Sequence, residues 1–380
     1  MVYFDNAATT YPKPHSVISA LTGALIEYGA NPGRAGHRLS MKTAEAVYNA
    51  REKCADFFSA KVENTAFMLN CTYALNTAIK GILKNGDHII CSDIEHNAVL
   101  RPIYACSKER NVTYSFARTY DDDNETVAEF ERHINRRTKA IVCTLAGNVT
   151  GKILPVKNIG EICQRYNLCF IVDAAQGAGL IPIKLSNGIN IICAAGHKGL
   201  YGPMGTGLLV TDGKYRLNTL VEGGTGSASK ELVQPEFLPD RFESGTINTA
   251  GAISLGAGID FIRNKGIETI YNHEMMLCRR FYNGLLAIPG VKLYTGFPDE
   301  KYAAVVPFNI GNTSSEEIAS KLSDMGFCLR GGYHCAYPVH KKIGTDSVGA
   351  VRFSPSVFST NGEVTALLKA ISRISSEQRI

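Results

Sequence analysis

Short apolar runs alternate with amphipathic segments along residues 66–210, and this alternation limits the possible folds more than any other feature. The runs predict strands at 66–69, 88–91, 113–116, 140–143, 169–172, 190–194 and 207–210. Between them, apolar residues recur at helical spacing, as in 74–83, 99–110, 126–134 and 156–166. Continuous apolar strands separated by helices predict a largely parallel sheet that helices cover on both faces. We therefore expect an α/β domain.

The pattern changes after residue 257. A long helical region over 250–287, with a break expected near Gly266, is followed by fewer strands mixed with helices. This mixture predicts a smaller α+β domain, and we place the large domain at 16–257 and the small one at 1–15 and 258–380. The stretch 222–239 is predicted to be a long loop, and loops of that length in compact enzymes are often functional.

Composition excludes several classes of protein. Charged residues make up 20% and hydrophobic residues 45% of the chain, which is typical of a soluble globular enzyme. The net charge of +5 is mild and its basic residues are scattered, so we expect no nucleic-acid partner. No apolar run approaches the length of about 18 residues that a membrane span needs. The polar start, MVYFDNAATT, is not a signal peptide.

The cysteines favour a reducing compartment. An odd number of cysteines, 11, without a secretory signal argues against a disulfide framework and predicts a cytoplasmic protein. No Cys-x-x-Cys pair is present, so we expect no metal site. Cys91, Cys143, Cys169 and Cys193 stand in apolar runs and are interpreted as core residues.

The segment AAGHKGLYGPMGTG contains the first candidate for chemistry. An apolar strand ends at Gly196-His197-Lys198, which places Lys198 at the carboxyl edge of the sheet, where such sheets bind ligands. Glycines on both sides allow a tight turn and a close approach of a ligand. One interpretation is a lysine that condenses with an aldehyde cofactor. The alternative is a surface lysine at a turn.

Three more strand ends carry polar residues. Asp173 closes the strand LCFIVD, where a carboxylate would suit the pyridine nitrogen of pyridoxal 5′-phosphate (PLP), although an acidic helix cap is the ordinary alternative. Thr72 begins a helix, and a hydroxyl with free backbone N–H groups suits a phosphate. His96 follows another strand and could stack on a cofactor ring, although a lone histidine is more often structural.

These motifs resemble the class V aminotransferase-fold PLP enzymes and, among them, the cysteine desulfurases. The resemblance runs nearly end to end and includes FDNAATT at 4–10, NPGRAGHRLS at 31–40, CTYALN at 71–76, EHNA at 95–98, GNVTGKILP at 147–155, VDAAQ at 172–176, GHKGLYGPMG at 196–205, RFESGTINT at 241–249 and RGGYHCA at 330–336. The short, glycine-framed cysteine segment is similar to the group II enzymes. The resemblance implies a PLP-dependent transferase type I fold.

The resemblance also implies roles for individual residues. Lys198 would hold the cofactor and move protons, Asp173 would pair with the pyridine nitrogen, Gln176 with the ring hydroxyl, and His96 would stack on the ring. Thr72 and His197 would bind the phosphate, as would Thr246 of a partner subunit, which implies a homodimer. Asn148, Arg352 and Arg330 would serve the substrate, and Cys335 would be the nucleophile that takes sulfur.

Two positions depart from the family pattern. Ala195 stands where a serine or threonine usually donates to the phosphate, and Tyr333 stands where a histidine often precedes the catalytic cysteine. The first removes one phosphate donor, and the second removes a group that could transfer protons. The effect of both changes stays open.

Cys335 needs an ionised thiol to attack sulfur, and an ordinary thiol with a pKa of about 8.5 is mostly protonated at neutral pH. We expect Arg330 and His334 to favour the thiolate as nearby cations, and Gly331 and Gly332 to let the segment approach the cofactor. The alternative is a loop cysteine without function.

The function predicted is a desulfurase that converts L-cysteine to L-alanine and passes a persulfide from Cys335 to an unknown acceptor protein. A selenocysteine lyase acting on L-selenocysteine, a class V aminotransferase or C–S lyase, and a non-enzymatic sulfur-relay scaffold are the alternatives.

Overall fold

The computed structural model describes residues 1–32, 36–186 and 188–377, so Gly33 to Ala35 of the motif at 31–40 lie outside the described residues. Its large sheet has seven strands in the order β2-β8-β7-β6-β5-β3-β4. The strands are β2 (Thr65–Met68), β3 (His88–Ser92), β4 (Thr113–Ala117), β5 (Thr138–Thr144), β6 (Cys169–Asp173), β7 (Ile191–Ala195) and β8 (Gly207–Thr211). All seven predicted strands are confirmed, and only β8 runs against its neighbours.

Both faces of this sheet are buried, as the continuous apolar strands predict. In β6, Phe170 and Val172 enter one hydrophobic cluster, while Ile171 between them enters a second cluster on the opposite face. The second cluster includes helices α3 (Cys71–Ile82) and α4 (Asn97–Glu109). The first cluster includes residues of α2 (Arg38–Phe57), α5 (Asp123–Arg132), α6 (Val156–Arg165) and α7 (Thr249–Lys265). The four cysteines assigned to the core are buried there.

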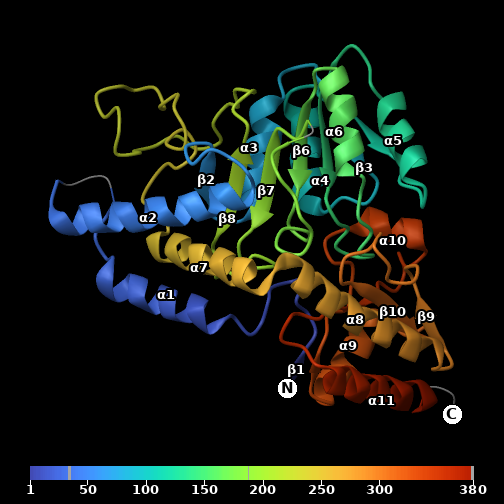
Figure 1. The fold of residues 1–380 in the computed structure, drawn as a ribbon. Coiled ribbons are helices and arrows are strands. Elements are labelled where there is room, and N and C mark those ends of the chain that lie inside the picture. Colours follow the sequence, from blue (N-terminus) through green and yellow to red (C-terminus); the bar gives the residue numbers. More distant parts are fainter. Residues whose placement is uncertain (33–35, 187, 378–380) are drawn as a thin grey trace.

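The C-terminal part forms smaller sheets. Strands β9 (Val291–Leu293), β10 (Val306–Ile310) and β12 (Val351–Phe353) form an antiparallel sheet in the order β12-β10-β9. The N-terminal strand β1 (Val2–Tyr3) pairs in parallel with β11 (Phe327–Cys328), so the two ends of the chain share this region. Helices α8 (Ile267–Leu286), α9 (Ser315–Asp324), α10 (Tyr337–Ile343) and α11 (Asn361–Glu377) complete it, at the lower right of Figure 1.

A helix break and a long loop match their predictions. Gly266 separates α7 from α8 and has φ +84°, a conformation that favours glycine. The segment 222–239 contains no helix or strand and lies above α2 in Figure 1. The proposed domain boundary at 257/258 falls inside α7 and stays a prediction. None of the helices formed by the described residues is both long and apolar enough to cross a membrane.

The first two helices were not predicted. Helix α1 (His15–Glu27) and α2 pack on α7 and together form the layer of long helices at the lower left of Figure 1. They leave large apolar side chains exposed on the described surface, namely Ile18, Leu25, Ile26, Leu39, Met41 and Tyr48. Because apolar residues also occupy the exposed face, the sequence of these helices lacks the usual alternation of apolar and polar residues at helical spacing.

Candidate functional site

One cavity at the carboxyl edge of the large sheet collects most of the predicted site residues. In the sheet, β6 is the parallel neighbour of β7, and Asp173 at the end of β6 pairs in register with Cys193 of β7. Lys198 follows three residues after the end of β7. The shared cavity is lined by Thr72, His96, Asn148, Asp173, Gln176, His197 and Lys198, together with Ala195.

Asp173 is buried and its carboxylate is oriented by two contacts on one oxygen. The backbone N–H of Ala175 donates to Oδ1 at 2.9 Å, and the Cys71 thiol donates to the same oxygen at 3.5 Å. Among the described residues, Oδ2 has no hydrogen-bond partner. This second oxygen is therefore available to a proton on a bound group.

The Gly-His-Lys turn is held by close backbone packing. A Cβ on Gly196 would lie 2.1 Å from Thr206 Oγ1, and one on Gly199 would lie 2.4 Å from the Ala178 carbonyl oxygen. The glycines are therefore required by their neighbours. The His197 carbonyl accepts from the N-terminal segment, with Lys13 Nζ at 2.8 Å and Thr10 N at 3.1 Å.

The electrostatics of this turn favour neutral side chains. Burial is the main cause that lowers the pKa of Lys198, Arg352 adds to it, and Asp173 opposes it. Burial, with Lys198 next, lowers the pKa of His197 to about 4, so its imidazole is neutral at pH 7. The Nδ1 atom of His197 is buried without a hydrogen-bond partner among the described residues.

His96 and Thr72 stand at helix N-termini that point into the cavity. His96 caps α4, and its Nδ1 accepts from Ala98 N at 2.9 Å, which leaves the ring proton on Nε2. Burial lowers the pKa of His96, against the opposing effect of Asp173. Thr72 is exposed in the first turn of α3, one residue after Cys71.

Arg352 is nearly fully buried, at 2% exposed, and a carboxylate accompanies it. Its Nη2 donates to Asp5 Oδ1 at 2.8 Å and its Nη1 donates to the Asn148 carbonyl at 3.0 Å. The Nε–H of Arg352 and the Oδ1 of Asn148 are buried without partners in the described part of the chain. The Nε–H of Arg352 is therefore available to donate to a substrate carboxylate, and the Oδ1 of Asn148 is available to accept from a substrate amine. Arg330 is exposed, and its backbone forms an antiparallel β-bridge with that of Arg352.

Cys335 is exposed and is held by residues of the same cavity region. Asn148 Nδ2 donates to the His334 carbonyl at 2.7 Å, and Asn97 N donates to the Cys335 carbonyl at 2.8 Å. His334 and Cys335 have φ angles of +49° and +57°, a left-handed conformation that is uncommon for residues with a side chain. These contacts bring the cysteine segment, α4 and the Asn148 loop together.

The predicted role of His334 as a cation is wrong. Its ring is buried and its Nε2–H donates to the Ala350 carbonyl at 2.9 Å. Burial, with Arg352 next, lowers the pKa of His334 to about 2, so the ring is neutral. Sequence adjacency misled the prediction, because the left-handed backbone turns this side chain inward. Only Arg330 of the two remains a cation beside the site.

Gln176 and Thr246 have other partners in this single chain. Gln176 Nε2 donates to the Ala7 carbonyl at 2.9 Å, which leaves its second N–H free for a ligand. Thr246 does not line the cavity of Lys198; it lines a separate one beside Tyr73 and Gly205, and Asn31 Nδ2 donates to its hydroxyl at 3.5 Å.

Two acidic residues, the partly exposed Asp5 and the buried Glu95, were not predicted individually. Asp5, in FDNAATT, neutralises Arg352, and Glu95, in EHNA, accepts from Thr144 N at 2.8 Å and from Ser92. Burial raises the pKa of Glu95 to about 8. Both were quoted only as parts of motifs, because nothing in the sequence alone pairs position 5 with position 352.

Comparisons with known proteins agree with this geometry. The family description "Aminotransferase class-V" matches residues 2–367. Probable cysteine desulfurases from Methanothermobacter thermautotrophicus and Pyrococcus abyssi are each 32% identical over 98% of this chain and 94% of their own length. The solved apo structure of a cysteine desulfurase from Thermococcus onnurineus superimposes with a TM-score of 0.92 at 31% identity, covering 99% of this chain and 95% of that one. The predicted type I fold is confirmed, and the chain belongs to the class V aminotransferase family, among its cysteine desulfurases.

Proposed function

We propose that this chain transfers sulfur from L-cysteine to Cys335 and releases L-alanine. In the balanced reaction, L-cysteine and the Cys335 thiol give L-alanine and a Cys335 persulfide, so the Cα-side fragment keeps its amine and carboxylate. The observation that carries the proposal is that the Cys335 segment is hydrogen-bonded to Asn97 and Asn148. Asn148 lines the Lys198 cavity, so these bonds hold the segment beside it.

The family implies PLP, and the residues of the cavity fit it. Lys198 supplies an amine with a lowered pKa, Asp173 Oδ2 is free to accept from a pyridinium, and the buried Nδ1 of His197 lacks a partner. The N-terminus of α3 at Thr72 suits a phosphate. Ala195 lines the same cavity and contributes no hydroxyl, so the phosphate would depend on the remaining donors. PLP, when bound, supplies an electron sink that stabilises negative charge at the substrate Cα.

The protein side chains would do the remaining work. The Nε–H of Arg352 and the second N–H of Asn148 Nδ2 would donate to the substrate carboxylate, with the Arg330 charge nearby. Lys198, as a neutral amine, would take the proton from Cα. His96, with its proton on Nε2, would lie against the cofactor ring. The Cys335 Sγ would attack the substrate sulfur, and the electron pair of the broken C–S bond would end as a C–H bond of alanine after protonation.

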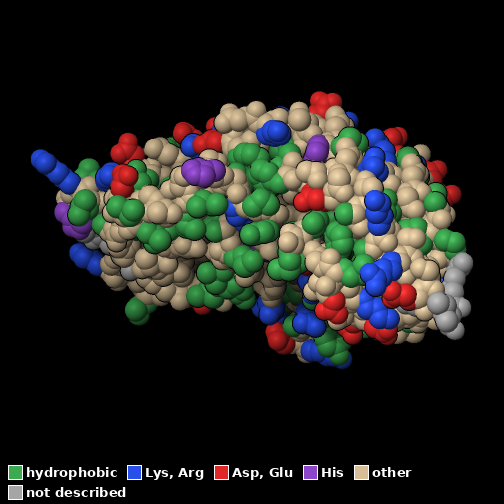
Figure 2. All heavy atoms as spheres, turned by 90° about the horizontal axis from the view of Figure 1, so that it is seen from below, with side chains coloured by type: hydrophobic (Ala, Val, Ile, Leu, Met, Phe, Trp, Pro, Cys, Tyr) green, Lys and Arg blue, Asp and Glu red, His purple; other side chains and the backbone are tan. Residues whose placement is uncertain are grey.

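A second copy of the chain would complete the site. Thr246 lies outside the cavity of its own chain, so it could reach a phosphate only in another subunit. Apolar side chains on α1 and α2 and in the long loop, such as Leu232 and Phe237, are exposed. Figure 2 shows hydrophobic side chains spread over the face that includes α1. We therefore propose a homodimer in which each subunit contributes to both sites.

The test compares Cys335→Ala with Cys328→Ala, because Cys328 is the only other cysteine among the described residues that is not buried. Alanine release from L-cysteine and from L-selenocysteine is measured for both variants and the wild type. Mass spectrometry looks for one added sulfur atom on the peptide that contains Cys335.

We expect Cys335→Ala to lose alanine release and persulfide from cysteine, whereas Cys328→Ala keeps both. Part of the selenocysteine turnover survives in Cys335→Ala, because a selenolate leaves without a protein nucleophile. Alanine release from cysteine at the wild-type rate by Cys335→Ala would refute the proposal, because sulfur would then leave without the Cys335 thiol. Pyruvate or 3-mercaptopyruvate in place of alanine would instead indicate a C–S lyase or an aminotransferase. A wild type that turns over neither substrate would indicate a scaffold.

A further inference from the structure

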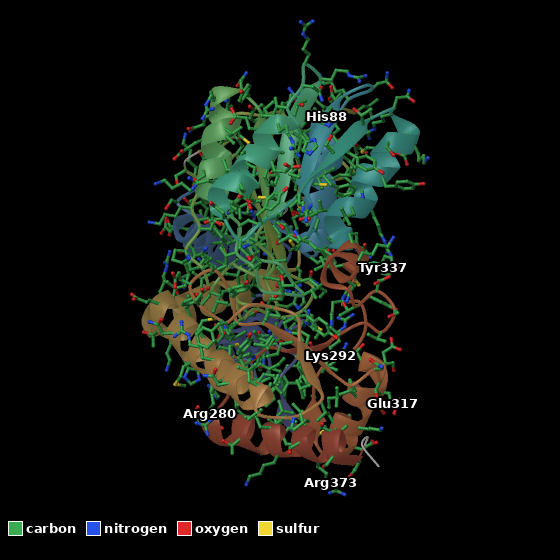
Figure 3. All side chains as sticks on the ribbon, turned by 90° about the vertical axis from the view of Figure 1, so that its right-hand side faces the viewer. His88, Arg280, Lys292, Glu317, Tyr337 and Arg373 are labelled. Carbon is green, nitrogen blue, oxygen red and sulfur yellow. The ribbon has the colours of Figure 1, made fainter. Side chains whose placement is uncertain are left out.

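Cys335 is followed in sequence by α10, a short helix that begins two residues later at Tyr337 and ends at Ile343. In Figure 3, Tyr337 marks this helix between His88 of the large sheet and Lys292 and Glu317 of the C-terminal part. Helix α10 therefore lies beside the large sheet in this view. Its last turn carries Lys342.

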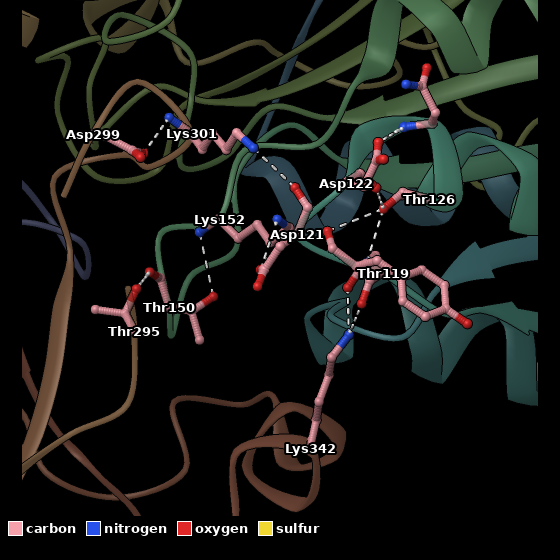
Figure 4. Close-up of polar contacts among 12 residues, drawn as sticks. Thr119, Asp121, Asp122, Thr126, Thr150, Lys152, Thr295, Asp299, Lys301 and Lys342 are labelled. Carbon is pink, nitrogen blue, oxygen red and sulfur yellow. Dashed lines mark hydrogen bonds and ion pairs between the residues drawn. The ribbon is translucent and has the colours of Figure 1, made fainter. Parts of the chain in front are cut away.

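Lys342 contacts the two loops that follow β3 and β4 of the large sheet. Its Nζ lies 2.7 Å from Asp93 Oδ2, 2.6 Å from the Thr119 carbonyl and 2.6 Å from Thr119 Oγ1. The Thr119 hydroxyl in turn donates to Asp93 Oδ1 at 2.8 Å, and Thr119 N donates to the same oxygen at 3.1 Å. Figure 4 shows Lys342 reaching from α10 to Thr119. We call Lys342, Asp93 and Thr119 the clasp.

The clasp is built on the loop that also holds Cys335. Asp93 follows β3 directly, and four residues later Asn97 N donates to the Cys335 carbonyl. Residues 335–342 are therefore attached to the 93–97 loop at both ends, by a backbone bond at Cys335 and by the ammonium group at Lys342. His96 of the cofactor cavity lies on the same loop.

Val339 of α10 packs into the hydrophobic core, but the end of the helix borders a hollow. This hollow has a volume of about 350 Å³ and is lined by Lys342 and Ile343 together with Thr150, Lys152 and Tyr294. Cys335 itself has a left-handed backbone, which is unfavourable for a residue with a side chain and which other contacts must therefore maintain. A polar attachment at the far end of α10 limits the freedom of the segment to leave that conformation.

We propose that Lys342 is a positioning residue for the nucleophile: through the clasp it holds α10, and thereby the Cys335 thiol, in the place from which it attacks the substrate sulfur. This inference rests on the proposed desulfurase function. It assigns to Lys342 an effect on sulfur transfer and none on cofactor binding.

The experiment compares Lys342→Met with Lys341→Met in the PLP-loaded dimer. Lys341 is the adjacent lysine of the same turn, and its Nζ lies 5.2 Å above the Tyr337 ring instead of on the large sheet. Thr119→Val and the double variant Lys342→Met/Thr119→Val complete the set. Alanine release is measured from cysteine and from selenocysteine, and alkylation of Cys335 by iodoacetamide is followed in the cofactor-free protein.

We expect Lys342→Met to lower kcat for cysteine by about tenfold, with KM changed less than about twofold, because a displaced nucleophile slows the step and not the binding. The part of the selenocysteine turnover that does not need Cys335 should be unchanged, and alkylation of Cys335 should become several-fold faster. Thr119→Val should act in the same direction, and the double variant should be no slower than Lys342→Met alone, because both act through one contact. Lys341→Met should match the wild type in all assays.

Three results overturn the inference. One is a Lys342→Met enzyme that matches Lys341→Met with cysteine and in alkylation. Another is a loss of both substrates together with the visible absorbance of the cofactor, which would place the effect on the fold of the cofactor cavity. The third is additive loss in the double variant. A wild type without alanine release from cysteine would instead overturn the proposed function, and that result is seen before any variant is compared.

Discussion

Replacing Asp5 by alanine tests whether a carboxylate from the N-terminal segment sustains Arg352, the arginine proposed to bind the substrate. Arg352 is 2% exposed, while Asp5 is 20% exposed at its side chain. Without Asp5, the guanidinium keeps only the Asn148 carbonyl as a hydrogen-bond acceptor among the described residues. Burial already lowers the pKa of Arg352, and the negative charge of Asp5 and its hydrogen bond both oppose that effect. Asp5→Ala therefore leaves a buried positive charge uncompensated.

The expected cost follows from the burial. Removing one partner of a buried ion pair costs about 3–5 kcal/mol, and the partial exposure of Asp5 favours the lower end, about 3 kcal/mol. An unfolding entropy of about 2.1 cal/mol/K per residue over 380 residues gives about 0.8 kcal/mol/K, so the midpoint of thermal unfolding should fall by about 4 °C. Asp5→Asn keeps an acceptor for Nη2 and should cost about half as much. In both variants KM for cysteine should rise, because the arginine is no longer held in place.

The assay is thermal unfolding of the cofactor-free protein, followed by steady-state kinetics of alanine release. Asp260→Ala is the control, because Asp260 pairs with Lys53 on the surface with both side chains about 40% exposed. An exposed pair of this kind contributes only about 0–1 kcal/mol. If Asp5→Ala lowers the unfolding midpoint no more than Asp260→Ala does, Arg352 does not depend on Asp5 and the reasoning fails.

Three further predictions concern the cofactor, pH and assembly. Lys198→Ala should lose the visible absorbance of borohydride-reducible cofactor, and a variant that stays yellow and reducible would place the cofactor on another lysine. Burial raises the pKa of Glu274 to about 8, so the stability that comes from its protonation is complete below its ordinary pKa and is lost as pH rises towards 8. The midpoint of thermal unfolding should therefore fall less between pH 6 and 9 in Glu274→Gln than in the wild type, and equal slopes would contradict this. Sedimentation should find a dimer, and mixing inactive Lys198→Ala with Thr246→Ala chains should restore some turnover through one intact composite site, whereas mixing that restores nothing would argue against a shared site.

The large sheet could be predicted because its signal is local. Each of its strands is a short apolar run between turn residues, and burial on both faces removes the ambiguity of a half-exposed strand. The same locality explains the success at strand ends. Asp173 and Lys198 stand next to their strands in the sequence, so the parallel arrangement alone brings them to one edge.

The contacts that complete the site join distant segments, and there the sequence analysis was limited. Nothing near Asp5 indicates Arg352, and the hydrogen bonds to the His197 carbonyl from Thr9, Thr10 and Lys13 are equally remote in sequence. The prediction for His334 failed for the opposite reason, since it relied on adjacency to Cys335. A residue's neighbours in sequence share its environment only when the backbone turns both side chains the same way.

Cys335 combines both limits. Its proposed role rests on the motif RGGYHCA, whereas its segment is held by Asn97 and Asn148 and, as we propose, through α10 by Asp93 and Thr119. The contact at Asn97 uses its backbone N–H, and one of the two Lys342 contacts at Thr119 uses its carbonyl, so no pattern of residue types could reveal these two. A desulfurase has to bring a thiol of the C-terminal part to a substrate bound on the large sheet. The residues that fix this distance therefore belong to the interface between the two parts, and substitutions at that interface should alter sulfur transfer before they alter the cofactor site.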